Sequence, residues 1–232
     1  MKIKLFLLIA CVLSGVALSH GQEPDEGDIQ FRNETKVYFL PYKKTDKKGK
    51  EQKIISPFIM GTIRVGQDVR HFVNERIGFG FDIRLNNYLK FTPSYYYVAE
   101  QKTKNKKAFE HRLRFEITAT KKWSKVELST RGRVEHRIKH STADGTRFRN
   151  KTKVAFPIKN DDGEEIFTPF AANEPFYDFN KKEWNRNEFS TGISKKFNKT
   201  LSGEFFYLFQ RNKSSTLKRL NAFGVNLKIT LD

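Results

Sequence analysis

The side chains best suited to chemistry in this chain are arginines and glutamates that alternate with apolar residues. Between positions 109 and 118 the odd positions carry Phe, His, Leu, Phe and Ile, and the even positions carry Glu, Arg, Arg, Glu and Thr. From 126 to 139 the pattern returns with its parity shifted. Because successive side chains of a strand point to opposite faces, each stretch predicts a strand with one apolar face and one ionic face. Glu and Arg on the ionic faces can pair across the two strands.

The candidate functional residues share one predicted position, the charged face of a strand, where they would line the inside of a barrel. Two interpretations remain open. The charges either form a paired network that fills a closed lumen, since unpaired buried charge is costly, or they line a constricted, anion-preferring passage. A narrow barrel favours the paired network. The candidates are Arg76, Asp82, Arg84, Glu110, Arg112, Arg114, Glu116, Glu127, Arg131, Arg133, Glu135, Arg137, Arg147 and Arg149.

Nucleophilic chemistry has less support in the sequence. A lipid-active enzyme of the lipase or deacylase type would need a serine and a histidine held together by a third polar group. His140 and Ser141 fall in a predicted loop, and His111 and His136 fall on apolar faces of strands, with no surrounding motif. No histidine and carboxylate spacing predicts a metal site. We therefore expect no catalytic residue, no metal and no cofactor.

Strands are predicted over almost the whole chain, joined by alternately short and long connections, and no helical period appears after the N-terminal segment. This pattern predicts an all-β, up-and-down meander. A long loop is expected over residues 175–185, and Pro169 interrupts the strand before it. The eleven predicted strands cover residues 29–40, 54–65, 76–85, 88–100, 109–118, 126–139, 147–156, 166–174, 186–197, 201–210 and 223–231.

The N-terminal segment predicts export from the cytoplasm. Residues 1–19 combine a basic start, an apolar run too short to span a bilayer and small residues at positions 17–19, which is typical of a secretory signal peptide. Residues 20–28 would be a flexible lead-in, and residues 29–232 the barrel domain. Cys11, the single cysteine, lies inside this signal, so the mature domain would have no disulfide; a lipid anchor on Cys11 is the alternative.

Charge and strand length together favour a membrane. The chain has 44 basic and 26 acidic residues, a net charge of +18, which indicates an anionic partner. Export argues against nucleic acid and for the lipid bilayer, with lysine-rich loops that could contact lipopolysaccharide phosphates. Strands of about 10–13 residues match a tilted membrane strand, and their number exceeds the eight or so of soluble lipocalin-like barrels.

The sequence thus predicts an up-and-down antiparallel transmembrane β-barrel in the bacterial outer membrane. Bacterial barrels have an even number of strands, so we expect about twelve, with ten as the alternative and one strand missing before residue 29 or within 54–74. The expected function is non-catalytic, either structural or a narrow anion-preferring, porin-like passage. A soluble periplasmic ligand-binding barrel and the lipid-active enzyme remain alternatives.

Several short motifs follow one another along the chain and carry a resemblance. The chain resembles a bacterial family of outer-membrane β-barrels catalogued as a domain of unknown function. The resemblance implies the fold and the location, and it implies no activity. The motifs are Asp28-Ile29-Gln30 with Asn33-Glu34, Tyr95-Tyr96-Tyr97, Glu110-His111-Arg112, the ladder Arg131, Arg133, Glu135 and Arg137, Arg147-Phe148-Arg149 with Pro157, and Glu174-Pro175-Phe176 before Asn185-Arg186.

Overall fold

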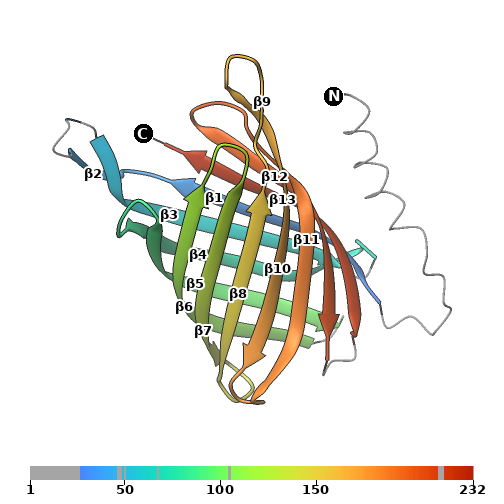
Figure 1. The fold of residues 1–232 in the computed structure, drawn as a ribbon. Coiled ribbons are helices and arrows are strands. Elements are labelled where there is room, and N and C mark those ends of the chain that lie inside the picture. The colour runs from blue at the N-terminus through green and yellow to red at the C-terminus, as the bar shows by residue number, and fades with distance from the viewer. Residues whose placement is uncertain are drawn as a thin grey trace, which may run out of the picture.

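Alternating apolar and polar residues form long strands throughout the described chain (Figure 1). The computed structural model describes residues 27–45, 49, 51–66, 68–103, 106–213 and 217–231. Within these ranges no helix is long and apolar enough to cross a membrane. The strands are β1 (Ile29–Tyr38), β2 (Tyr42–Thr45), β3 (Glu51–Gly66), β4 (His71–Arg84), β5 (Leu89–Thr103), β6 (Lys106–Lys122), β7 (Glu127–Lys139), β8 (Gly145–Ala155), β9 (Ile158–Lys159), β10 (Glu165–Asp178), β11 (Glu183–Lys196), β12 (Leu201–Asn212) and β13 (Arg219–Thr230).

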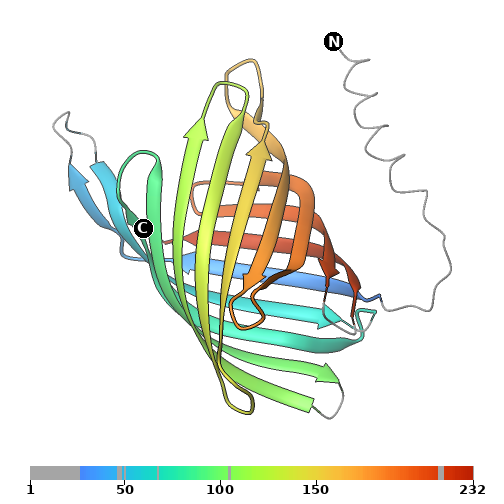
Figure 2. The same ribbon diagram turned by 60° about the horizontal axis from the view of Figure 1, so that its bottom comes forward.

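The strands close into a barrel. From β3 to β13 each long strand pairs antiparallel with the next, and β8 lies beside β10. β1 closes the ring, because it pairs antiparallel with β3 and parallel with β13 (Figure 2). Eleven strands form the wall, whereas β2 extends the pairing along β3 and β9 pairs only with β10. The predicted all-β, up-and-down barrel is therefore confirmed.

The wall has eleven strands, which lies between the expected number of about twelve and the alternative of ten, and it is not even. An even number is required only when every neighbouring pair is antiparallel, and the parallel pairing of β1 with β13 allows eleven. β3 and β4 account for the strand content of residues 54–74, and the described chain starts only two residues before β1. The segment proposed as a signal peptide lies outside the described residues.

The long loop predicted over residues 175–185 is also wrong. β10 continues through Pro169 and Pro175 to Asp178, and β11 begins at Glu183, so only a short turn separates them. Pro175 pairs with Asn187 of β11, but the pairing with β8 passes over it. A proline is tolerated in a strand where it does not need to donate a hydrogen bond to its neighbour.

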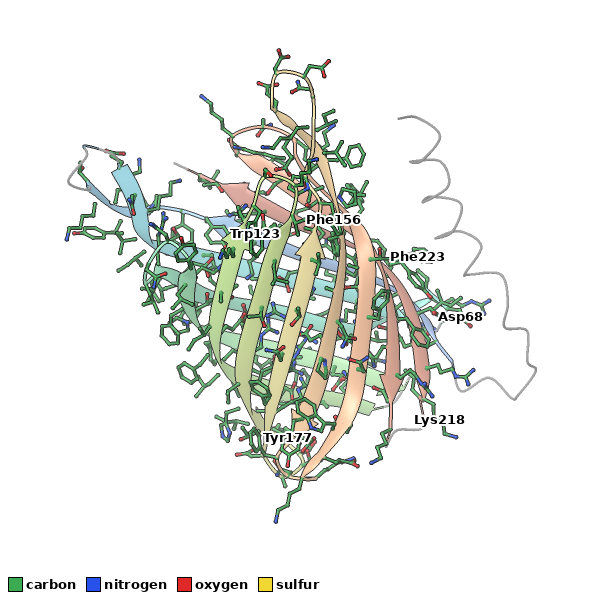
Figure 3. All side chains as sticks on the ribbon, viewed as in Figure 1. Asp68, Trp123, Phe156, Tyr177, Lys218 and Phe223 are labelled. Carbon is green, nitrogen blue, oxygen red and sulfur yellow. The ribbon has the colours of Figure 1, made fainter. Side chains whose placement is uncertain are left out.

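The two ends of the barrel are defined by the direction of the strands. We call the end that carries the turns after β4, β6 and β11 the Trp123 end, and the opposite end, which carries the turn between β3 and β4, the Asp68 end. Figure 3 labels Trp123 and Phe156 at the first end, and Asp68, Tyr177 and Lys218 at the second.

The outer wall is apolar and the interior is a mixture of charged and aromatic side chains. Phe79, Phe115 and Phe223 point outward, with 53%, 51% and 61% of their surface exposed. Inside, one apolar cluster contains Phe58 and Tyr96, and a second, smaller one lies on β12 and β13. Arginines and glutamates fill the space between these clusters. The barrel is therefore inverted relative to a soluble domain, with its largest apolar surface on the outside.

Two glycines of β4 make room for the interior rings. A Cβ at Gly78 would lie 2.4 Å from Cδ1 of Tyr96, and one at Gly80 would lie 2.7 Å from Cζ of Phe58. The rings therefore lie directly on the backbone of β4, where any side chain would displace them. This explains why the two glycines lie next to each other on the inner face of β4, between Arg76 and Asp82.

Candidate functional site: the ionic interior of the barrel

Glu135 on β7 is the centre of the interior network and has no exposed surface. Its carboxylate accepts hydrogen bonds from Arg147 at 2.6 Å and from Arg133 and Arg149 at 3.3 Å. The Nε atom of Arg114 lies 3.6 Å away. The strand register explains the gathering, since Arg114 and Arg147 are the direct neighbours of Glu135 on β6 and β8. One buried carboxylate thus contacts four guanidinium groups.

Two further glutamates extend the network along the barrel wall. The carboxylate of Glu116 on β6 lies 3.0 Å from Nε of Arg133 and 3.7 Å from Nε of Arg131. Glu174 on β10 accepts from Arg131 at 2.8 Å and from Arg149 at 2.9 Å. Because each of these arginines contacts carboxylates on more than one strand, the ion pairs link β6, β7, β8 and β10 into one unit.

Other pairs carry the network toward the Asp68 end and across the interior. Glu110 on β6 pairs with Arg112 of the same strand and with Arg137 of β7, at 2.8 Å for the latter. Glu188 on β11 lies 3.6 Å from Arg32 on β1. The ion pairs therefore reach β1, the strand that closes the barrel.

Aromatic rings share the interior with the guanidinium groups. Arg149 lies 4.1 Å from the ring centre of Phe176, and Arg114 lies 4.2 Å from that of Tyr96. A cation over an aromatic face is stabilised, most strongly where water is excluded. Two more arginines approach Phe176, Arg147 at 5.2 Å and Arg186 at 5.4 Å.

Three of the candidate residues lie apart from this network, near the rim of the Trp123 end. Asp82 accepts from Lys90 at 2.7 Å and from two neighbouring hydroxyls. Arg84 is exposed and bonds to the turn that follows β4. Glu127 pairs with Lys122 at 2.6 Å. These side chains share the face of the network residues but not their depth along the strands.

Arg76, the remaining candidate, donates a 2.6 Å hydrogen bond to Asn74 and has no carboxylate partner among the described residues. The sequence-based candidates missed five interior residues, namely Arg32, Arg64, Glu174, Arg186 and Glu188. Arg32 has a visible signal, because it alternates with Gln30 and Glu34 on β1. Glu174 and Glu188 fall inside the predicted strands 166–174 and 186–197, close to the segment that was predicted as a loop, and they were not named among the candidates.

The interior is not equally filled along its length. A cavity of about 130 Å³ lies within the network and is lined by Arg32, Arg64 and Arg76. Two larger hollows, of about 630 and 580 Å³, lie at the Trp123 end and share Lys53 and Lys228. The barrel therefore opens into a basic vestibule at one end and narrows to a small charged cavity within.

The histidines make contacts that do not resemble a catalytic site. Nδ1 of His111 lies 2.6 Å from the Tyr95 hydroxyl, and Nδ1 of His136 lies 3.0 Å from that of Thr146. His140 and Ser141 are both exposed. In the described ranges no serine hydroxyl bonds to a histidine ring, and no three His, Cys, Asp or Glu side chains gather as metal ligands would.

Residues 46–221 match the family described as "Protein of unknown function (DUF2490)". The chain belongs to this family. The expected family of unknown function is thereby confirmed. Among solved structures, this DUF2490 chain is similar to the porin NanC, solved in a rhombohedral crystal form, at 12% identity and a TM-score of 0.48; the match covers 88% of this chain and 99% of that one. No curated protein matches the sequence.

Proposed function

We propose that this protein is an integral β-barrel of the bacterial outer membrane, without catalytic activity, whose interior is a narrow anion-preferring passage held together by paired charges. The orientation of the side chains carries this proposal. Phe79, Phe115 and Phe223 are exposed on the outer wall, whereas Arg112 and Arg133 are buried inside. A soluble ligand-binding barrel would need the opposite arrangement, an apolar lumen and a polar wall.

Strand length supports a membrane position. The wall strands from β3 to β13 contain 11 to 17 residues. A tilted strand of about 9–11 residues spans the hydrocarbon core of a bilayer. Each of these strands is therefore long enough to cross the bilayer. Trp123 and Tyr177, at opposite ends in Figure 3, are suited to the two membrane interfaces.

The surplus of positive charge inside the barrel supports the preference for anions. Arg64, Arg76 and Arg186 have no carboxylate partner among the described residues, and the vestibule at the Trp123 end is lined by lysines. Basic walls attract anions and exclude cations. The small central cavity limits the passage to small solutes, so the network stabilises the barrel and sets the constriction at the same time.

The remaining partners follow from the membrane location. The outer wall contacts lipid. Basic residues at the Asp68 end, including Arg211, Lys213 and Arg219, are suited to contact lipopolysaccharide phosphates, if this end faces outward. Export requires the N-terminal segment to act as the signal peptide that its composition predicts.

Cell fractionation and planar-bilayer recording test the proposal together. The mature chain should be found in the outer-membrane fraction, and the purified protein should produce a small conductance whose reversal potential in a salt gradient has the sign of an anion-selective pore. The mature chain in the soluble periplasm would refute the membrane location. A cation-selective conductance would refute the anion preference.

A further inference from the structure

We propose that the interior holds a binding site for one small tetrahedral oxyanion, of the phosphate or sulfate type, at Arg32, Arg64 and Arg76. We call these three residues the arginine cluster. The site deepens the proposed function, and it rests on that function for the route by which the ion arrives. The cluster lies on β1, β3 and β4, and the cavity that it lines is also lined by Arg114, Arg133 and Arg149 of the network around Glu135.

The backbone brings the three guanidinium groups together. Arg32 of β1 is the direct neighbour of Arg64 on β3, and Arg76 of β4 is the neighbour of Thr62 on the same strand. The cluster thus occupies three adjacent strands on the inner face. All three arginines and Thr62 line the central cavity of about 130 Å³.

The cluster is not neutralised by the protein. Its only carboxylate partner among the described residues is Glu188, which lies 3.6 Å from Arg32 and is shared with Arg149 at 3.9 Å. Arg76 bonds only to the Asn74 amide. The arginines around Glu135 and Glu174, by contrast, each contact at least one carboxylate. Arg32 is buried, and Arg64 and Arg76 are half-buried. Because charges withdrawn from water without partners are destabilising, a bound counter-ion would stabilise the arginine cluster.

Two donors at the cavity point to the missing acceptor. Nε of Arg64 is buried without a hydrogen-bond partner, and so is the hydroxyl of Thr62, a residue only 5% exposed. Buried donors are nearly always satisfied in folded proteins. Water could accept these hydrogen bonds but would leave the surplus charge in place. An oxyanion would accept these hydrogen bonds and would also compensate the surplus charge. A guanidinium group matches the geometry of an oxyanion with two parallel N–H donors.

The size of the cavity restricts the ligand. Its volume of about 130 Å³ corresponds to the share of roughly four water molecules in the liquid. This space accommodates the oxyanion group of a phosphate or a sulfate. Glu34, Glu204 and Asn226 line both this cavity and the larger hollow at the Trp123 end, so the two are continuous. Lys36 and Lys228 in that hollow would raise the local concentration of anions.

The test is equilibrium binding of inorganic phosphate to the folded full-length mature chain in detergent micelles, measured by isothermal titration calorimetry in chloride buffer. We expect saturable binding of one phosphate per chain and competition by sulfate. Arg64→Gln and Arg76→Gln should each weaken binding about ten-fold or more, or ~1.4 kcal/mol, as expected for the loss of a charge-assisted hydrogen bond. Arg70→Gln removes the same charge from the exposed turn nearby and should leave the affinity within about two-fold.

Thr62→Val is the second variant, for the case in which an arginine variant does not fold. It keeps every charge and the side-chain shape, and it should weaken phosphate binding several-fold. Absence of saturable binding, or equal affinity in the wild type and in folded cluster variants, would overturn the site. An anion-selective pore that does not bind phosphate would refute the site alone. Phosphate binding by a protein that conducts no ions would refute the passage alone.

Discussion

Replacing Glu135 with glutamine should destabilise the barrel more than any other single removal of a carboxylate. Glutamine keeps the shape of the side chain and removes the charge that faces Arg114, Arg133, Arg147 and Arg149. Because Glu135 is fully buried, no water is available to replace the lost carboxylate. The four guanidinium groups would then face one another with less compensation.

The distances give the magnitude. An ion pair at about 3.3 Å contributes on the order of 5 kcal/mol at an effective dielectric constant of about 20. Desolvation of the charges and repulsion among the arginines offset most of the attraction energy summed over the ion pairs of Glu135. Breaking a buried ion pair by removing one partner has a net cost of about 3–5 kcal/mol. We expect Glu135→Gln to lower the free energy of unfolding by that amount.

The assay is urea unfolding of the protein in phospholipid vesicles, followed by the fluorescence of Trp123 and Trp184. Glu127→Gln is the matched control, because Glu127 pairs with Lys122 at the rim, where the two side chains are 28% and 72% exposed. Such a pair contributes under about 1 kcal/mol. If Glu135→Gln unfolded at the same urea concentration as Glu127→Gln, the reasoning that the interior charges stabilise the barrel as a network would be refuted.

The same assay tests three further substitutions and one more control, Gly61→Ala. Gly78→Ala should cost about 1–3 kcal/mol, because its Cβ would lie 2.3 Å from a backbone carbonyl oxygen of β5, whereas Gly61→Ala, with open space around it, should change stability by less than about 0.5 kcal/mol. Phe115→Lys should cost about 2–4 kcal/mol in vesicles, and a loss near zero would mean that the outer wall faces water. Phe176→Leu removes the ring beneath three arginines and should cost about 1–3 kcal/mol, while an unchanged midpoint would show that these contacts contribute nothing.

The alternation of side chains predicts most of the fold because it is a local property. The run from Arg76 to Leu85 assigns each residue to the apolar or the polar face without reference to any other strand. The face on which a side chain lies, however, does not determine its depth along the barrel axis. Arg84 and Glu127 have the parity of the interior residues, yet they lie at the rim, because their strands end there. Depth depends on where the turns fall and on the tilt of the strands, which a single strand does not encode.

The pairing of distant strands is the part that the sequence does not predict. Nothing local to β1 indicates that it lies parallel to β13, and the strand number depends on that choice. The pairs that cross this closure, such as Arg32 with Glu188, are equally invisible. Glu174 was also missed as a candidate, because Pro175 suggested the end of a strand that in fact continues.

The parallel contact between β1 and β13 has a consequence for assembly. The Asn33 side chain bonds to the carbonyl of Val225, 192 positions later in the sequence. Bringing such distant segments together has a large entropic cost and is slow. Before this contact forms, the apolar face and the charged face of the open sheet are both exposed to the same solvent. No single solvent is favourable for both faces. The apolar face and the charged face are separated from each other only when β1 pairs with β13. Closure of the barrel and insertion into lipid are therefore expected to occur as one concerted event.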